Sequence, residues 1–328
     1  MQYTPLKKRK ASAQGNALGD ARVYARLDEL VRLRFKASGF SFLPRQPVHS
    51  VLSGKHASRL RGRGLNFEEL RHYLPGDDIR SIDWRVTART REPHVRVYTE
   101  ERDRTVWLLV DQRISMFFGS RWKMKSVMAA EATAVSAWRV LAAGDRVGAV
   151  IFNDENIDII EPHRSSDRVM HILRKLVDRN HELRADLATA PQPDMLNLAL
   201  RKLRELARHD CLVTIISDGL GIDEASVKDI TGLSQHNDIL AVFIYDPLEQ
   251  SLPDAGRLVF SDPGGQLEVN TASLKLRDDF RMSFKARIEQ LKTASRKHAI
   301  PVLTLSTDTD ALAQVKRQLG HISSARRG

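Results

Sequence analysis

The sequence has little of several features that mark particular classes of protein. Its single cysteine, Cys211, excludes an internal disulfide and indicates a reducing compartment, for which we expect the cytoplasm. No apolar run approaches the roughly 20 residues that a membrane-spanning helix needs, so no membrane segment is expected. The basic residues 1–10 have no apolar stretch behind them and do not predict a secretory signal. The Gly-Arg-Gly at 62–64 lacks the Gly-Lys-Ser/Thr that would complete a phosphate-binding loop.

Charge is abundant but unevenly placed along the 328 residues, whose net charge is +11. Residues 1–104 hold 22 Lys and Arg against 12 Asp and Glu, whereas the remaining residues hold 30 against 29. A surface for nucleic acid or for an acidic partner is therefore expected in the first third. Because the charges there alternate in sign, a solvated face with internal ion pairs is the other interpretation, and the one we favour.

The first third divides into a tail and a segment that we place at residues 21–103. Residues 1–20 are polar without periodicity and predict a disordered tail. A helix is predicted through Leu27, Leu30 and Phe35, which have helical spacing. Residues 61–89 mix arginines with acids, glycines and a Pro-Gly turn, which indicates either an irregular loop held by Arg–carboxylate pairs or a phosphate- or nucleotide-binding surface. The alternation at residues 94–98 predicts a strand or ribbon beside the main sheet.

From Val106 onward, short apolar runs alternate with helical stretches, which is typical of an α/β protein with a doubly wound, mostly parallel sheet. We place this domain at residues 104–320, followed by a basic tail at 321–328. Strands are predicted at residues 106–110, 146–152, 157–160, 212–218, 239–245 and 302–305. The sequence thus predicts one large α/β domain preceded by an Arg-rich irregular or β segment.

Three of the predicted core strands end in an acid: Asp111, Asp218 and Asp246. Ligands of open α/β sheets bind at the carboxyl ends of the strands, so Asp111 and Asp218 are expected to converge on one edge. Paired carboxylates near serine hydroxyls suit a hard cation such as Mg²⁺. Alternatively, each Asp caps the turn or helix that follows it.

The chain also resembles known families. The Asp-x-x-x-Ser at 111–115, Gly-Asp-Arg-Val-Gly at 144–148 and Ile-Ser-Asp-Gly at 216–219 resemble a von Willebrand factor A-type domain. More specifically, the chain resembles the bacterial family called domain of unknown function 58 over roughly residues 45–310. Its motif residues here are Arg61, Gly62, Gly64, Pro75, Gly76, Asp77, Asp78, Asp83, Trp84, Asp246 and Pro247. The resemblance implies a member without transmembrane segments that acts with a MoxR-type AAA+ ATPase in assembling or maturing a client protein.

The A-type domain usually binds a divalent metal through an Asp-x-Ser-x-Ser loop, a Thr and a second Asp. The resemblance carries these roles to Asp111, Ser115 and Asp218, but Arg113 replaces the first Ser and Asp194 replaces the Thr. An Arg is a permanent cation without an acceptor. We therefore expect Arg113 to point inward and to bind Asp111, Asp194 and Asp218 in place of the metal. If Arg113 turns outward, the acids remain free for Mg²⁺.

Three functions are compatible with these features. We favour a non-enzymatic adaptor that contacts its ATPase or client through Arg113, Met116, Phe117 and Phe118, of which the last three form an apolar tip if exposed. The alternative for the Phe side chains is that they fold back into the core. A nucleic-acid or nucleotide binder using the Arg-rich third is the second hypothesis. A metal-dependent hydrolase using Asp111 and Asp218 ranks last, because no catalytic spacing of His, Glu or Ser is evident.

Overall fold

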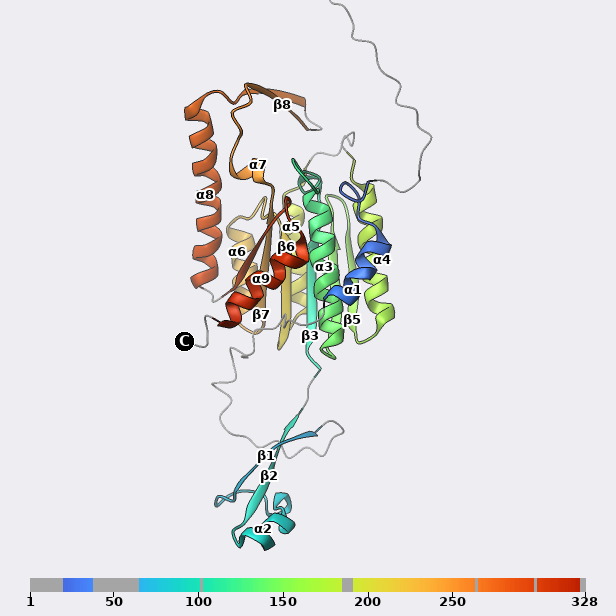
Figure 1. The fold of residues 1–328 in the computed structure, drawn as a ribbon, viewed down its shortest axis with the longest axis vertical. Helices are drawn as coiled ribbons and strands as arrows, with labels where there is room; N and C mark the ends of the chain where they lie inside the picture. The colour runs from blue at the N-terminus through green and yellow to red at the C-terminus, as the bar shows by residue number, and fades with distance from the viewer. Residues whose placement is uncertain are drawn as a thin grey trace, which may run out of the picture. The chain divides into compact units, whose positions relative to one another are not determined.

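The fold was examined in a computed structural model, which describes residues 20–37, 65–100, 103–184, 191–262, 265–297 and 300–324. Two compact units are formed, the first from residues 1–44 and 105–328 and the second from residues 45–104. Figure 1 shows the elements in both. The predicted tail at 1–20 and the glycines of the Gly-Arg-Gly sequence lie almost wholly outside the described residues.

The second unit is built on an antiparallel ribbon. Strand β1 (Leu65–His72) pairs with β2 (His94–Glu100), and between them lie a short 3-10 turn, η1 (Ile79–Ser81), and helix α2 (Trp84–Thr90). A strand at residues 94–98 was predicted, but beside the main sheet. In the structure β1 and β2 instead form a separate two-stranded sheet. Strand β2 pairs with β1, which precedes it in the chain, so it needs no partner strand from the main sheet.

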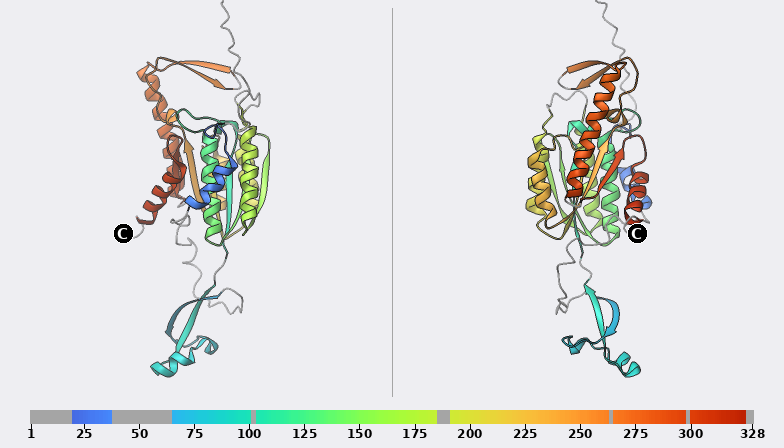
Figure 2. Two further views of the ribbon diagram at one scale, coloured as in Figure 1. Left: turned by 45° about the vertical axis from the view of Figure 1, so that its right-hand side comes forward. Right: turned by 90° about the vertical axis from the view of Figure 1, so that its left-hand side faces the viewer.

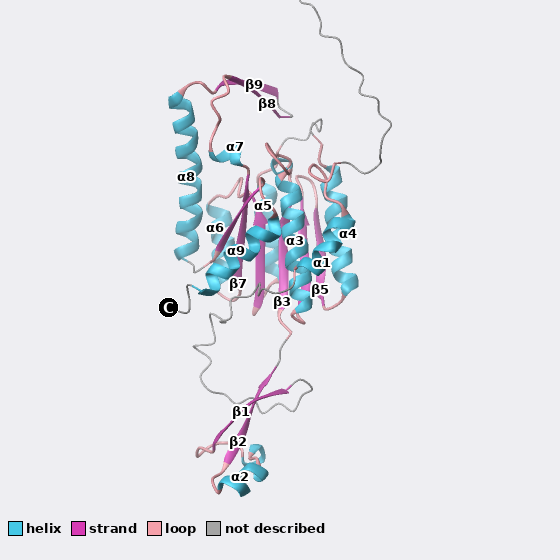
Figure 3. Ribbon diagram, viewed as in Figure 1, coloured by secondary structure: helices cyan, strands magenta, loops and turns pink. Residues whose placement is uncertain are grey.

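The first unit contains the predicted sheet. Six strands lie in the order β10-β7-β6-β3-β4-β5, and only β5 runs antiparallel to its neighbour among these described strands. Their bounds are Thr105–Asp111 (β3), Arg146–Phe152 (β4), Ile157–His163 (β5), Cys211–Ser217 (β6), Asp238–Tyr245 (β7) and Val302–Ser306 (β10). Figure 3 shows this sheet in magenta between layers of helix. The predicted α/β class with a doubly wound, mostly parallel sheet is thus confirmed.

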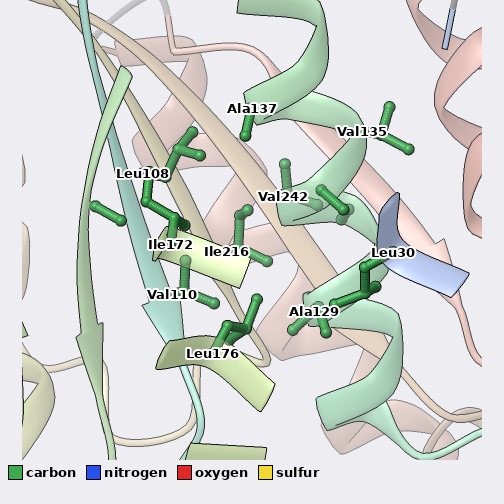
Figure 4. Close-up of a cluster of buried hydrophobic side chains, with 14 of the residues drawn as sticks. Leu30, Leu108, Val110, Ala129, Val135, Ala137, Ile172, Leu176, Ile216 and Val242 are labelled. Atoms are coloured by element: carbon green, nitrogen blue, oxygen red, sulfur yellow. The ribbon is translucent and has the colours of Figure 1, made fainter. Parts of the chain in front are cut away.

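Helices cover both faces of the sheet, which explains why the strand sequences are apolar runs rather than alternating ones. On one face Leu108 and Val110 pack in a core with α1 (Leu27–Lys36), α3 (Lys125–Ala142), α4 (Ser166–Glu182) and α9 (Ala311–Ser324). On the other face Trp107 and Leu109 pack with α5 (Asp194–Leu206) and α6 (Glu224–Ser234). The two views in Figure 2 show helices in front of and behind the strands, and Figure 4 shows the first of these cores.

Helix α1 belongs to the α/β body, which corrects the prediction that it forms one segment with the Arg-rich residues. Leu30 is 1% exposed in the core, and its carbonyl oxygen accepts a hydrogen bond from the Trp138 indole nitrogen on α3 at 3.1 Å. The Asn180 side chain on α4 accepts from the Ala25 backbone at 2.7 Å. These contacts dock α1 on two helices of the body, so the division between units falls after α1.

The last part of the body continues with α7 (Pro247–Gln250), the ribbon of β8 (Arg257–Asp262) and β9 (Gly265–Asn270), and α8 (Leu274–Lys297). Phe284 of α8 packs on Tyr245 with ring centroids 5.5 Å apart. Helix α9 runs through Ser324, so the predicted tail at 321–328 begins inside a helix. Among the described residues, no helix is long and apolar enough to cross a membrane.

Candidate functional site

The carboxyl edge of the sheet at β3 and β6 is the candidate site. The strand order reverses between these two neighbours, because the chain leaves β3 toward β4 on one side and reaches β6 on the other. Such a switch point is where open α/β sheets bind ligands. Strand β3 ends at Asp111, and β6 ends at Ser217 with Asp218 next. The two acids therefore meet at one edge, as the sequence predicted.

Arg113 turns inward and binds Asp111. Its Nε lies 3.0 and 3.2 Å from the two Asp111 carboxylate oxygens, and its Nη2 lies 2.7 Å from the second of them. The Asp111 side chain is fully buried and that of Arg113 is 3% exposed. Arg113 also donates to the carbonyl oxygens of Leu220 at 2.9 Å and Pro193 at 3.4 Å. One guanidinium thus joins the loops that follow β3 and β6 to the start of α5.

The prediction that Arg113 also binds Asp194 and Asp218 is wrong, because the only described side chain to which Arg113 donates is that of Asp111. Asp194 opens α5 with an exposed side chain, and it makes no hydrogen bond or ion pair within the described part of the chain. The carbonyl of Pro193, one residue earlier, takes the contact instead. At the start of α5 the Asp194 side chain is exposed to solvent, whereas the preceding carbonyl, that of Pro193, faces Arg113.

Asp218 is held by a second internal cation, Lys125, which the sequence analysis did not identify. The Lys125 Nζ lies 2.8 Å from an Asp218 oxygen and 2.8 Å from a Glu249 oxygen, and its side chain is 3% exposed. Lys125 is the first residue of α3, where the helix dipole disfavours a positive charge. Two carboxylates, those of Asp218 and Glu249, offset this cost.

The protonation states follow from these pairs. Burial raises the pKa of the Asp111 carboxyl, and the nearby Arg113 guanidinium opposes that rise. Burial alone would raise the pKa of Asp218, but the charge and hydrogen bond of Lys125, the hydrogen bond from the Leu220 backbone and the charge of Arg113 together outweigh it, so the pKa lies below the ordinary value. Burial lowers the pKa of Lys125, whereas Asp218 and Glu249 raise it further, and the net shift is upward. Lys125 therefore stays charged at neutral pH.

Neighbouring polar groups fix the loop around Arg113. The Ser217 hydroxyl donates to Asp111 at 2.7 Å. Asp154, which follows β4, accepts from the Ile114 backbone at 2.6 Å and from the Gln192 backbone at 2.8 Å. The sequence analysis did not identify Asp154, because its two partners are distant in the chain. The Ser115 hydroxyl oxygen is buried without a hydrogen-bond partner among the described residues.

The expected apolar tip at Met116, Phe117 and Phe118 needs correction. Met116 is 0% exposed and belongs to the first core, because the 3-10 turn η2 (Ile114–Met116) directs it inward. Phe117 and Phe118 are half-buried, and Phe117 packs on Tyr24 with ring centroids 5.8 Å apart. The exposed apolar side chains of this edge are Trp122 (38%) in the same loop and Leu220 (45%) after β6.

Asp246, the third acid at a strand end, has a structural role. It caps α7 by accepting from the Leu248 backbone at 2.8 Å, and Glu249 closes the capping box by accepting from the Asp246 backbone at 2.9 Å. It also accepts from the hydroxyl of Thr307 at 2.5 Å and from the backbone of Ser120 at 2.8 Å. Asp246 thereby ties the loops after β3, β7 and β10 together, with Pro247 as the first residue of α7.

The other family-motif residues shape the second unit. Arg71 binds Asp77 through two bonds of 2.7 Å, Asp78 caps η1, and Asp83 caps α2 while binding Arg96 at 2.8 Å. These are the Arg–carboxylate pairs that the sequence favoured for this segment. Pro75 and Gly76 form the turn, with Gly76 at φ 107°. Trp84 is 65% exposed, and Arg61, Gly62 and Gly64 lie outside the described residues.

The donor set fits a metal ion poorly. Both oxygens of Asp111 face the guanidinium of Arg113, and one oxygen of Asp218 faces the ammonium of Lys125 while the other accepts from the Leu220 backbone at 2.9 Å. An additional cation would meet two fixed positive charges. Within the described ranges, no group of three or more His, Cys, Asp or Glu side chains is arranged to hold a metal.

Known proteins similar to this chain were found by sequence and by structure. A family described as "Protein of unknown function DUF58" matches residues 69–298. The uncharacterized proteins Rv1480 of Mycobacterium tuberculosis and Mb1516 of Mycobacterium bovis are each 32% identical over 290 residues, covering 87% of this chain and 87% of the relative.

Solved structures resemble it weakly. The hypothetical protein BatB of Bacteroides thetaiotaomicron is 14% identical with a TM-score of 0.38, over 69% of this chain and 100% of that one. A von Willebrand factor type A protein of Catenulispora acidiphila is 15% identical with a TM-score of 0.30, over 46% and 35% of the two chains.

Proposed function

Because the chain belongs to the family described as protein of unknown function DUF58, we propose that it is a non-enzymatic protein-interaction module. In this proposal it works in the cytoplasm as an adaptor for a MoxR-type AAA+ ATPase or for a client protein of that ATPase. Its von Willebrand factor A-like sheet edge then binds protein without a bridging metal, so the edge is a degenerate form of a metal-ion-dependent adhesion site.

One observation carries the proposal: both acids at the switch point already have a cation from the chain itself. Arg113 neutralises Asp111, and Lys125 neutralises Asp218. These pairs are buried, so their geometry is present before any partner arrives, and the loops they hold need not be ordered by a ligand. The same pairs remove the free carboxylates that a metal-dependent hydrolase would use, which gives that function less support.

The binding surface of the proposal is the exposed part of the two loops that Arg113 joins. Trp122 lies in the loop after β3, and Leu220 lies after β6 with its carbonyl oxygen held by Arg113 at 2.9 Å. Trp is among the side chains that most often anchor protein interfaces. We call Trp122 and Leu220 the rim pair. It replaces the Met116–Phe118 tip that the sequence suggested.

Binding of the purified ATPase tests the proposal. The double variant Trp122→Ala/Leu220→Ala should bind at least about ten-fold more weakly than the wild type, because interface anchors cost about 2 kcal/mol or more when truncated. The control is Ile159→Ala/Leu198→Ala, which removes side chains of 43% and 44% exposure from β5 and α5. Equal affinity of the rim variant and the wild type would reject the rim pair as the docking surface.

A second candidate, nucleic-acid binding, is favoured by one feature of the small unit. Trp84 is exposed on α2 beside Arg85 and Arg89, which are also exposed, while Asp77 and Asp83 are engaged by Arg71 and Arg96. An exposed aromatic ring among arginines is suited to stacking on a base. The candidate predicts binding of single-stranded DNA that weakens steeply as salt rises and that is lost in Trp84→Ala. No band shift at low salt would remove it.

A further inference from the structure

Three large apolar side chains are exposed in one short stretch of the small unit, residues 45–104. Leu74, Ile79 and Trp84 are 57%, 61% and 65% exposed. We call them the apolar trio. Single apolar side chains are normal on a protein surface, but several large ones close together in the chain indicate an interaction surface.

The backbone that carries the apolar trio is held by three acids. Asp77 accepts from the backbone of Leu74 at 2.9 Å. The turn η1, which begins with the second member of the trio, is capped by Asp78. Helix α2, which begins at Trp84, is capped by Asp83. The trio is therefore presented on an ordered backbone, which lowers the entropic cost of binding a partner.

The same part of the unit carries an excess of positive charge, since residues 70–96 hold six Arg and four Asp or Glu. Two of the arginines, Arg71 and Arg96, bind Asp77 and Asp83. The other four are exposed and form no ion pair within the described ranges. They are Arg80, Arg85, Arg89 and Arg91, and we call them the unpaired arginines. Internal pairs thus account for only part of the charge, and the remainder favours a negatively charged partner.

The chemistry of the apolar trio distinguishes between negatively charged partners. A single-stranded nucleic acid would stack on Trp84 but would leave the aliphatic Leu74 and Ile79 in water. A second copy of this chain, related by two-fold symmetry, would bring the same arginines together. A protein segment with acids beside large apolar side chains matches both the trio and the arginines.

We propose that the small unit binds an acidic segment of another protein. Apolar side chains of that segment contact the apolar trio, and its carboxylates pair with the unpaired arginines, which bind carboxylates in a defined geometry. Binding should weaken as the salt concentration rises, because the paired charges lie at the surface. The inference does not rest on the rim pair, which belongs to the other compact unit.

Selection from a phage-displayed library of random peptides, with the full chain as bait, tests the proposal. We expect the selected peptides to be rich in Asp, Glu and large apolar residues. Fluorescence anisotropy then measures the affinity of a synthetic copy of the leading peptide. The variants Ile79→Ala/Trp84→Ala and Arg85→Gln/Arg89→Gln should each bind it at least about ten-fold more weakly than the wild type.

Matched controls alter exposed side chains of the α/β body. Ile159→Ala/Leu198→Ala removes two apolar side chains, and Arg174→Gln/Arg208→Gln removes two positive charges. Both controls should bind the peptide as the wild type does. Equal weakening by the arginine control would indicate attraction by overall charge and would overturn the proposal.

Three further results would overturn it. The first is that no peptide is selected or that the selected peptides lack acids. The second is that both variants of the small unit bind the peptide as tightly as the wild type. The third is that oligo(dT) displaces the peptide while Ile79→Ala changes neither affinity, which would assign the surface to nucleic acid. If the apolar variant disturbs the small unit by NMR, the arginine variant decides, because Arg85 and Arg89 are exposed on α2.

Discussion

At the scale of single residues, the site depends on which cation neutralises which acid. The sequence predicted the contact of Arg113 with Asp111, because the two residues share a loop and a guanidinium there has few other partners. It did not predict Lys125, which is 93 residues from Asp218 and looks like an ordinary helix residue. The error at Asp194 has the same origin, since side-chain direction at a helix start depends on the packing of that helix.

Replacing Arg113 should therefore destabilise the body strongly. In Arg113→Ser the fully buried Asp111 loses its cation, and breaking a buried pair in this way costs about 3 to 5 kcal/mol. Urea unfolding at neutral pH measures the change. The control Arg121→Ser, an exposed position in the same loop, should change the free energy of unfolding by less than about 0.5 kcal/mol. Equal stability of Arg113→Ser and the wild type would contradict the role assigned to the pair.

Asp77 gives a prediction about pH in the small unit. The hydrogen bonds from Arg71 lower the pKa of Asp77 from an ordinary value of 3.8 to about 2. Because the folded pKa is the lower one, the pair stabilises the fold above about pH 4, and this contribution is lost as the pH falls toward about 2. Carboxyl-carbon NMR should give a midpoint near 2, which Arg71→Gln moves toward 3.8. A wild-type midpoint near 3.8 would refute the pairing in solution.

At the scale of elements, apolar runs predicted the strands well because the sheet is buried on both faces. All six strands of the main sheet were predicted, with ends that differ by a few residues. The direction of β5 and the pairing of β1 with β2 could not be predicted, because strand pairing depends on contacts between distant residues. For the same reason, the sequence could not decide whether Phe117 and Phe118 are exposed or fold back into the core.

Gly148 in β4 shows how closely β4 and β5 pack against each other. A Cβ at this position would lie 2.7 Å from the Ile160 carbonyl oxygen and 2.8 Å from the Pro162 nitrogen, at the irregularity in the pairing of β4 with β5. Gly148→Ala should therefore lower the free energy of unfolding by about 1 to 3 kcal/mol. Gly232→Ala in α6 should raise it by about 0.5 to 1 kcal/mol, because its Cβ meets only the Arg204 side chain at 3.7 Å. Chemical denaturation of both variants distinguishes a clash from a general effect of alanine.

At the scale of the whole molecule, the two compact units are the main difference from the prediction. The sequence placed α1 with the Arg-rich segment because they are adjacent in the chain. Instead, the chain forms α1, leaves the α/β body for residues 45–104 and then returns at β3. Such an excursion cannot be recognised from local patterns, since the docking of α1 depends on α3 and α4.

Because residues 45–104 form a separate compact unit, we expect the α/β body to fold without them. Replacing residues 45–104 with a flexible Gly/Ser linker should leave the thermal midpoint of the body within a few degrees, because its two cores contain none of the described residues of that segment. Calorimetry of the shortened chain tests this. Loss of a cooperative transition would mean that the body needs the small unit to fold.

The central claim is that Arg113 and Lys125 take the place of a metal at the sheet edge. Calorimetric titration of the full chain with Mg²⁺ and Mn²⁺ tests it most directly, with Asp111→Ala as the comparison. We expect no saturable binding by the wild type, because a metal would have to displace two buried cations from their carboxylates. Micromolar binding by the wild type that is lost in Asp111→Ala would contradict the claim.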